Sequence, residues 1–240
     1  HHSIFVLKDA LQPGDSLEFS FNLQYKTVGF AREGADLAVT ANGSYFINHT
    51  WLPSIGYQAN RELHLARDRQ AHQLPPKPAI QPLQDEEVQQ QLADQERIRF
   101  EAVVGTSVGQ TAVTSGSLQH TWTENGRQYF YYVADAPIRN LFAFYSAAYA
   151  VRETVWKDIL IQVLYHPTHA HQVDRMLKSA EASLTYYTQH FGPYPHQQLR
   201  FVEYPGVGSG ASAYPGTIAL TEKFSMLNPD EDWRDIDLAF

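Results

Sequence analysis

Residues 191–222 constrain the fold more than any other stretch of the chain, and they read FGPYPHQQLRFVEYPGVGSGASAYPGTIALTE. Gly192-Pro193 ends a helix, because glycine accepts the left-handed conformation at a helix terminus and proline cannot continue the helix. Residues 199–204 and 217–221 are short, mainly apolar runs that predict strands. The glycine-rich loop between them, residues 205–216, leaves its backbone open to a close neighbour or a ligand. A helix, a strand, a loop and a second strand in this order predict an α/β unit.

The composition is that of a globular protein with a β-rich body. The chain has 240 residues, 43% of them hydrophobic, and its 14 Tyr and 13 Phe favour pleated surfaces, on which aromatic side chains pack well. The net charge of −8 and the scattered Lys and Arg argue against nucleic acid or an anionic membrane as a partner. No apolar run is long enough to cross a bilayer, so we expect no membrane insertion of this segment. Cysteine is absent, so His and carboxylate side chains would have to hold any transition metal.

The first two thirds of the chain carry strand signals. Residues 17–25 alternate apolar and polar side chains, which predicts a half-buried strand. Asn125-Gly126 is the preferred pair for a type I′ turn, so residues 118–123 and 128–133 should form a hairpin. Residues 154–165 are apolar on both faces, which predicts a strand covered on both sides. Further strands are predicted at residues 39–51, with a break at Asn42-Gly43, at 100–106 and at 141–151.

Two changes of pattern interrupt these strands. A proline-rich stretch and a short exposed helix at residues 85–97 predict a surface insertion at about residues 67–99. After Pro167, apolar residues recur every three or four positions as far as Phe191, which predicts a long helix.

The predicted fold is therefore mainly β with an α/β C-terminal part. We expect an N-terminal antiparallel β domain at residues 1–167 and the beginning of a second domain at residues 168–240. Asn228-Pro229 predicts a further helix, because Asn caps helices and Pro fits their first turn. The apolar stripe after it is cut off at residue 240, so we expect a longer parent protein.

The order of these parts resembles the aminopeptidase N family of gluzincin zinc metallopeptidases. Within residues 173–222, SLTYYTQHFGPYP is close to the family's usual entry into its catalytic domain. The glycine-rich loop is similar to the family's Pro-x-x-x-x-Gly-Ala-Met-Glu-Asn-x-Gly strand at Pro205, Gly210, Ala211 and Gly216. The resemblance implies a saddle-like antiparallel β domain followed by the first helix and strands of a thermolysin-like catalytic domain.

The resemblance also implies a peptide cleft beside a zinc ion. The family's motif strand lines that cleft, so the expected substrate-binding residues are Gly210, Ala211, Ser212, Ala213 and Tyr214. Ala213 stands where the family has a glutamate that, with a second acid, holds the free ammonium group of the substrate. The family binds zinc through His-Glu-x-x-His and a later Glu, and this sequence contains no His-Glu-x-x-His. We therefore expect the zinc ligands of the parent beyond residue 240, no catalytic or metal-binding residue here, and no activity of this chain alone.

Other polar residues have simpler interpretations. His166, His169 and His171 have no acid near them in the sequence before Asp174, so a surface role at the domain joint is favoured over a metal site. Glu203 precedes the glycine-rich loop, and a paired or solvated carboxylate is favoured over a general acid or base. Core packing is favoured over a carbohydrate platform for one aromatic set: Tyr129, Tyr131, Tyr132, Phe142, Phe144, Tyr145 and Tyr149.

We expect the parent to hydrolyse peptide bonds, with this chain as one wall of the cleft and a peptide as substrate. The alternative is a non-catalytic peptidase-fold module for interaction or sensing beside a membrane transporter. The PPKP insertion and the Asp135-Ala-Pro-Ile segment resemble a bacterial branch of the family in which the module is attached to a transporter permease. That branch implies an extramembrane domain of a bacterial inner-membrane protein. A third and weaker interpretation is an independent β-sandwich binding module.

Overall fold

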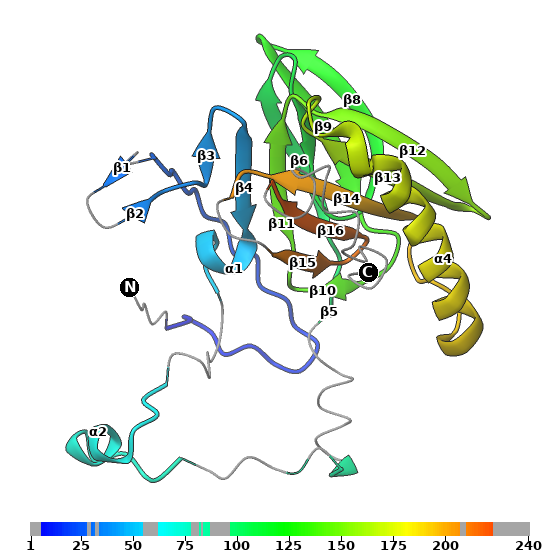
Figure 1. Cartoon of the computed structure of the whole chain (residues 1–240). Helices are drawn as coiled ribbons and strands as arrows, with labels where there is room; N and C mark the ends of the chain where they lie inside the picture. The colour runs from blue at the N-terminus through cyan, green and yellow to red at the C-terminus, as the bar shows by residue number, and fades with distance from the viewer. Residues whose placement is uncertain are drawn as a thin grey trace.

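The computed structural model describes residues 6–27, 30–31, 34–54, 62–77, 82, 84–86, 97–206 and 210–222. These residues form a mainly β structure in which a five-stranded sheet is the central layer (Figure 1). The three middle strands run parallel, and an antiparallel strand flanks them on each side. In spatial order the strands are β12 (Ala150–Trp156), β13 (Ile159–Tyr165), β14 (Gln198–Tyr204), β16 (Thr217–Thr221) and β15 (Ala211–Tyr214).

Helix α4 (Val173–Phe191) covers one face of this sheet (Figure 1). Its buried residues recur every three or four positions, as predicted, because this spacing places them on one side of a helix. They pack against Ile161 and Val163 of β13 and Phe201 of β14. Gly192 ends the helix with a positive φ of 104°, which a residue with a side chain adopts only under strain. A short 3₁₀ helix, η2 (Ala170–Gln172), precedes α4 at the joint with β13.

A second sheet covers the opposite face of the central sheet. In spatial order it consists of β3 (Val39–Thr40), β4 (Gly43–Ile47), β11 (Ala143–Ala147) and β7 (Thr111–Val113). Tyr145 and Val113 of this sheet pack in one cluster with Leu164 of β13 and Val202 of β14. Strand β13 is therefore covered on both sides, as its apolar residues predicted.

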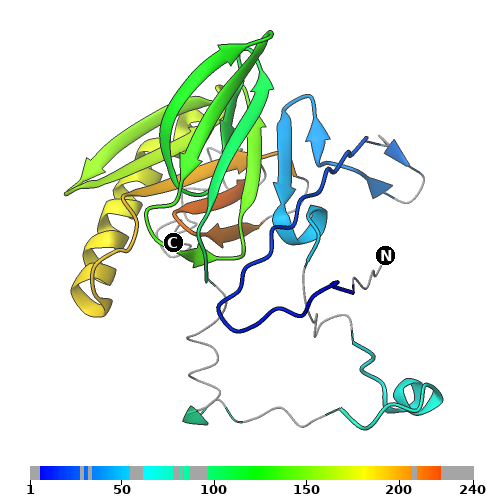
Figure 2. The ribbon, with the colours of Figure 1, turned by 180° about the vertical axis from the view of Figure 1, so that it is seen from behind.

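A third, antiparallel sheet is formed by β6 (Glu101–Ser107), β9 (Arg127–Val133) and β8 (Ser117–Glu124), which are green in Figure 2. The predicted hairpin between β8 and β9 is confirmed. Asn125 and Gly126 have φ values of 48° and 71°, the positive values that a type I′ turn requires at both central positions. The remaining elements are short: β1 (Phe30–Ala31), β2 (Gly34–Ala35), α1 (Asn48–Trp51), α2 (Ala66–Ala71), β5 (Arg97–Ile98) and β10 (Ile138–Arg139).

Residues 17–25 do not form the predicted strand. They pair with no other strand in the described part of the chain, and their five alternating apolar side chains are 36% to 59% exposed. Tyr25 is held in place, since its ring centroid lies 4.0 Å from that of Trp51. The prediction was wrong because alternation describes the side chains only, whereas a strand also needs a neighbour that accepts and donates backbone hydrogen bonds.

Three further predictions need correction. Residues 154–165 are not one strand, because a turn at Lys157, with φ of 52°, separates β12 from β13. Residues 48–51 form helix α1 rather than the end of a strand. The predicted loop at residues 205–216 contains the edge strand β15, whose ladder partner β16 follows it directly in the sequence.

Some predictions fall outside the described residues or stay open. Residues 87–96 and 223–240 carry most of the helix predicted at 85–97 and all of the one predicted from residue 228, and they are not described. The proposed domain boundary at residue 167 stays a prediction. None of the described helices is long and apolar enough to span a membrane.

A buried arginine ties the central sheet to the segment that precedes β8. Arg200 of β14 is 4% exposed, and its guanidinium donates hydrogen bonds to the carbonyl oxygens of Gly116 (2.9 Å) and Thr114 (3.2 Å). Its Nε donates to Oε1 of Gln162 at 3.0 Å. Burial lowers the pKa of Arg200, since the buried cation is separated from water. Glycine is required at position 116 by a different neighbour, because a Cβ there would lie 2.6 Å from the backbone of Val133 on β9.

We expect the contact between α4 and the central sheet to contribute strongly to stability. Met176→Ala should lower the free energy of unfolding by about 2–5 kcal/mol, because the side chain is 1% exposed and its removal leaves a cavity. Urea unfolding followed by circular dichroism measures this change. The control is Lys178→Ala, an exposed position on the same helix, for which a change within about 0.5 kcal/mol is expected. Equal losses in the two variants would contradict the packing described for α4.

Candidate functional site

The residues predicted to bind substrate lie together at the edge of the central sheet. Gly210 precedes β15, and Ala211, Ser212, Ala213 and Tyr214 make up the whole strand. Strand β15 pairs with β16 and with no other strand in the described part of the chain. One side of its backbone is therefore free of ladder partners among the described residues.

The register identifies which backbone groups face this free side. The carbonyl oxygen of Gly210 accepts a hydrogen bond from the backbone N–H of Thr221 at 3.2 Å, so these two residues form a hydrogen-bonded pair of the ladder. Such pairs alternate along an antiparallel ladder, so Ser212 and Tyr214 also bond toward β16. The N–H and C=O groups of Ala211 and Ala213 consequently point away from the sheet.

The side chains of β15 divide between the two faces of the sheet. Ala211 and Ala213 are exposed, and they lie opposite Leu220 and Ile218, which belong to the core on the α4 side. Tyr214 lies on the other face, where it is 8% exposed and packs against the second sheet. The α4 side of the edge therefore carries only methyl groups, which leaves room for a ligand beside the free backbone.

An apolar groove lies on the same side of the sheet, next to the end of α4. Its cavity volume is about 360 Å³. Phe201 of β14, Ile218 of β16, and Tyr187 and Phe191 of α4 are among its lining residues. Ile218 connects the groove with the edge strand, because it is the ladder partner of Ala213.

Tyr214 anchors the edge strand to the second sheet. Its hydroxyl lies 2.6 Å from the hydroxyl of Tyr45 on β4, within hydrogen-bond distance. The ring of Tyr45 is stacked with those of Tyr204 (3.9 Å between centroids) and Tyr145 (5.2 Å). Burial, together with the hydrogen bond to Tyr214, raises the pKa of Tyr45, so this hydroxyl keeps its proton at neutral pH. The position of β15 thus depends on a tyrosine that lies 169 residues away in the sequence.

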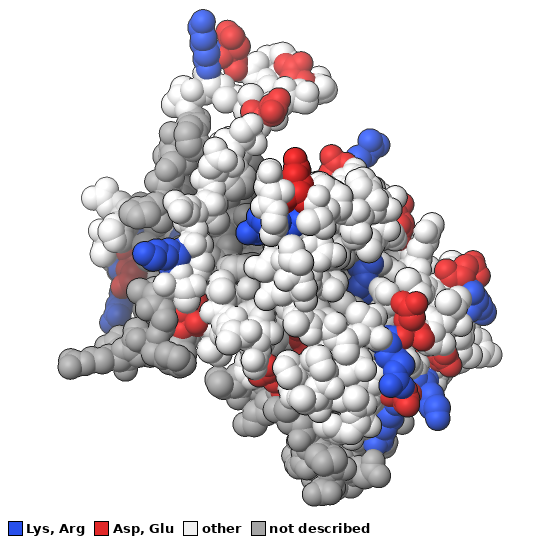
Figure 3. Space-filling model, turned by 90° about the horizontal axis from the view of Figure 1, so that it is seen from above, with Lys and Arg blue, Asp and Glu red and all other residues white. Residues whose placement is uncertain are grey.

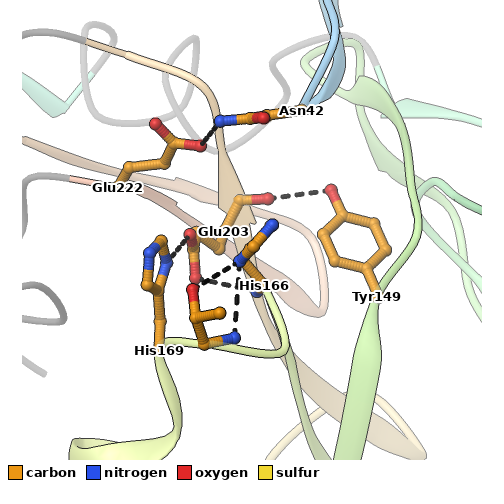
Figure 4. A network of polar contacts seen from close by, with 7 residues as sticks. Asn42, Tyr149, His166, His169, Glu203 and Glu222 are labelled. Carbon is orange, nitrogen blue, oxygen red and sulfur yellow. Dashed lines mark hydrogen bonds and ion pairs between the residues drawn. The ribbon is translucent and has the colours of Figure 1, made fainter.

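A second cluster of polar residues lies where the parallel strands end (Figure 4). Glu203 of β14 is 3% exposed, and its Oε2 accepts a hydrogen bond from the backbone N–H of His166 at 3.1 Å. Its Oε1 lies 2.5 Å from Nδ1 of His169. Burial raises the pKa of Glu203, the hydrogen bonds from His166 and His169 oppose this shift, and the nearby charge of Glu222 adds to it.

Tyr149 and Asn42 complete this cluster. The hydroxyl of Tyr149 donates to the backbone carbonyl of Glu203 at 2.8 Å, and the amide of Asn42 donates to Glu222 at 3.0 Å (Figure 4). The cavity between these residues has a volume of about 10 Å³, room for no more than one water molecule. The cluster therefore connects β14 with Tyr149 and with the segment before α4, and it leaves no space for a substrate.

The sequence interpretation of these residues was correct in part. Glu203 is a paired carboxylate, as expected, but its partner His169 was assigned no nearby acid, because Glu203 lies 34 residues further along the chain. Nothing local in the sequence signals this pair. In the part of the chain that the structure describes, no three His, Asp or Glu side chains come together in a way that could hold a metal ion.

The aromatic set divides between core and surface. Tyr132, Phe142 and Tyr145 are at most 6% exposed, as core packing predicted. Tyr129 and Tyr131 are only half-buried, because they alternate with the buried residues of β9 and so point to the opposite face.

Charges on the surface are interspersed. On the face seen from above in Figure 3, Lys and Arg side chains alternate with Asp and Glu across a mostly uncharged surface. The described residues on this face form no continuous basic stripe.

Comparison with known proteins does not identify this chain. No model of a protein family matches it, and no curated protein is similar enough to be reported as a relative.

The contact between Tyr45 and Tyr214 can be tested with a double-mutant cycle. We expect Tyr45→Phe and Tyr214→Phe each to lower the free energy of unfolding by about 1–2 kcal/mol, since each leaves the other hydroxyl without its partner. The double variant should lose less than the sum of the two, by about 0.5–1.5 kcal/mol. Urea unfolding gives all four values. Strictly additive losses would show that the two hydroxyls do not interact.

Proposed function

We propose that this chain forms one wall of a peptide-binding cleft in which an extended peptide pairs with the free edge of β15. The observation that carries the proposal is the outward direction of the backbone N–H and C=O groups of Ala211 and Ala213. Addition of a strand to such an edge supplies main-chain hydrogen bonds that do not depend on the peptide sequence. The small side chains of Ala211 and Ala213 leave room for alternate side chains of the peptide, and the apolar groove beside Ile218 would receive apolar ones.

We further propose that the parent is an aminopeptidase N-like zinc metallopeptidase that hydrolyses peptide bonds. The support is the resemblance of residues 173–222, together with the position of residues 211–214 on an edge strand. The described residues do not fit a zinc site, so we assign no hydrolytic step to this chain. The resemblance implies that the zinc ligands of the parent lie beyond residue 240. Zinc would supply an activated water molecule in the parent.

The absence of a carboxylate at position 213 defines the expected peptide. A free ammonium group in a water-poor cleft needs opposed carboxylates, and Ala213 supplies none. We therefore propose that β15 recognises the peptide backbone rather than the free N-terminus. Acetylating the N-terminus of a probe peptide should change its affinity by less than about twofold, whereas losing an ion pair of about 1.4 kcal/mol would change it tenfold.

Binding at the edge can be tested with two substitutions at position 213. Ala213→Pro removes an outward N–H without removing a hydrogen bond to β16, so it should weaken binding of a fluorescein-labelled Ala/Thr decapeptide at least about fivefold. Fluorescence anisotropy measures the affinity. The matched control is Ala213→Val, which keeps the N–H and favours a strand, and should bind within about twofold of the unchanged chain. Equal affinities of the Pro and Val variants would overturn binding at this edge.

The second candidate is a non-catalytic interaction or sensing module in an extramembrane part of a bacterial membrane transporter. One observation favours it, because Ala213 stands where the family has the glutamate that holds the substrate's ammonium group. Both candidates predict peptide binding at β15, so hydrolysis separates them. The purified parent protein should cleave the decapeptide and lose this activity with a zinc chelator if it is a peptidase. Binding without cleavage, unchanged by zinc, would establish the module instead.

A further inference from the structure

The chain contains two Asn-Gly pairs, Asn42-Gly43 and Asn125-Gly126, and each lies at the turn of a β-hairpin. An asparagine followed by glycine can rearrange spontaneously, because the backbone nitrogen of the glycine attacks the side-chain amide of the asparagine. Glycine has no side chain to hinder this approach, and its backbone is free to turn. Since the two pairs have the same local chemistry, the structure around each pair decides whether the rearrangement takes place.

Asn125 and Gly126 form the exposed tip of the β8–β9 hairpin. The ladder ends at the pair of Glu124 and Arg127, so the N–H of Gly126 takes no part in it. A Cβ built at Gly126 would have no described atom within 4 Å, so this backbone is not packed against a neighbour in the described part of the chain. Among the same residues, no hydrogen bond holds the side-chain amide of Asn125. The backbone nitrogen and the amide are therefore free to approach each other.

The backbone nitrogen of Gly43 is held in a ladder, because the β3–β4 turn places its Asn-Gly pair one position later. The backbone N–H of Tyr45 donates to the carbonyl oxygen of Ala38 at 2.9 Å, so these two residues form a hydrogen-bonded pair. Such pairs alternate along an antiparallel ladder, so Thr40 and Gly43 form the next one. The N–H of Gly43 consequently donates to Thr40, and attack on Asn42 would first require this pair to open.

Packing and a side-chain hydrogen bond add to this protection. A Cβ built at Gly43 would lie 2.8 Å from the backbone oxygen of Ser146 on β11, so the glycine has no room to turn. Oε1 of Glu222 accepts a hydrogen bond from the amide of Asn42 at 3.0 Å (Figure 4). Both reacting groups of this Asn-Gly pair are thus held in place, whereas those at the tip of the β8–β9 hairpin are not.

We propose that Asn125 is a site of spontaneous deamidation and that the fold protects Asn42 from the same reaction. The nitrogen of Gly126 loses its proton to a base in the solvent and forms a bond to Cγ of Asn125. The bond from Cγ to Nδ2 breaks, and Nδ2 takes up a proton and leaves as ammonia. Water then opens the resulting cyclic imide at either carbonyl carbon, which gives aspartate or isoaspartate. The reaction does not depend on peptide binding at β15.

Both products change the tip of the hairpin. Each places a carboxylate where the asparagine is neutral, so modified chains should be separable by ion exchange. Isoaspartate also inserts an extra carbon atom into the backbone of a tight turn whose geometry depends on both of its central residues.

Peptide mapping by mass spectrometry, after incubation of the purified chain in mildly alkaline buffer, measures deamidation at the two sites separately. Peptides that contain Asn125 should convert at least about tenfold faster than those that contain Asn42, because Gly43 must first leave its ladder. The same incubation in guanidinium chloride is the control. The two rates should become similar there, since unfolding removes the ladder and the packing that protect Asn42.

A substitution tests the chemistry of the step. Gly126→Ala keeps Asn125 and adds a methyl group in the path of the attack, so it should slow conversion of Asn125 and leave that of Asn42 unchanged. Faster conversion of Asn125 in the folded chain, with similar rates after unfolding, supports the proposal. Equal rates at the two sites in the folded chain, conversion of Asn125 only after unfolding, or a difference that persists in the unfolded chain would overturn it.

Discussion

The structure depends on the need to cover the central sheet on both faces. Strands β13, β14 and β16 run parallel and carry apolar side chains on both sides, and water must be excluded from each side. Helix α4 covers one face, and the sheet formed by β3, β4, β11 and β7 covers the other. Two charged side chains that enter this buried layer are paired: Arg200 binds backbone carbonyl oxygens, and Glu203 binds the joint of α4.

This arrangement leaves polar groups that could interact with other molecules or segments at two places. The first is the outer edge of β15, where backbone groups have no ladder partner among the described residues. The second is the carboxyl end of the parallel strands, where residues from separate parts of the chain meet because parallel strands end on the same side. The edge suits recognition of an extended chain. The strand ends enclose a cavity too small for a ligand larger than water, and their polar contacts connect β14 with the joint of α4.

Much of the fold and part of the site could be predicted from local patterns. Helix α4 lies where the spacing of its apolar residues predicted it, and it ends at Gly192 as predicted. Strands β14 and β16 lie where short apolar runs predicted them. The predicted hairpin has its turn at Asn125-Gly126. Residues 211–214 form the edge strand β15, and their role in binding a peptide stays a prediction. The pairing of His169 with Glu203, and of Tyr45 with Tyr214, could not be predicted, since neither partner has a local signal for the other.

The sequence by itself determined the elements whose conformation depends on neighbouring residues. Glycine and asparagine permit positive φ. Apolar residues that recur every three or four positions lie on one face of a helix. Both effects are local and do not depend on the rest of the chain. Only the tertiary structure decided that residues 17–25 stay unpaired despite their alternation, and that β15 forms within a predicted loop. It also decided which backbone groups of β15 face outward. These outcomes depend on which distant strand supplies hydrogen bonds and which face is already covered, and neither is encoded within a short stretch of sequence.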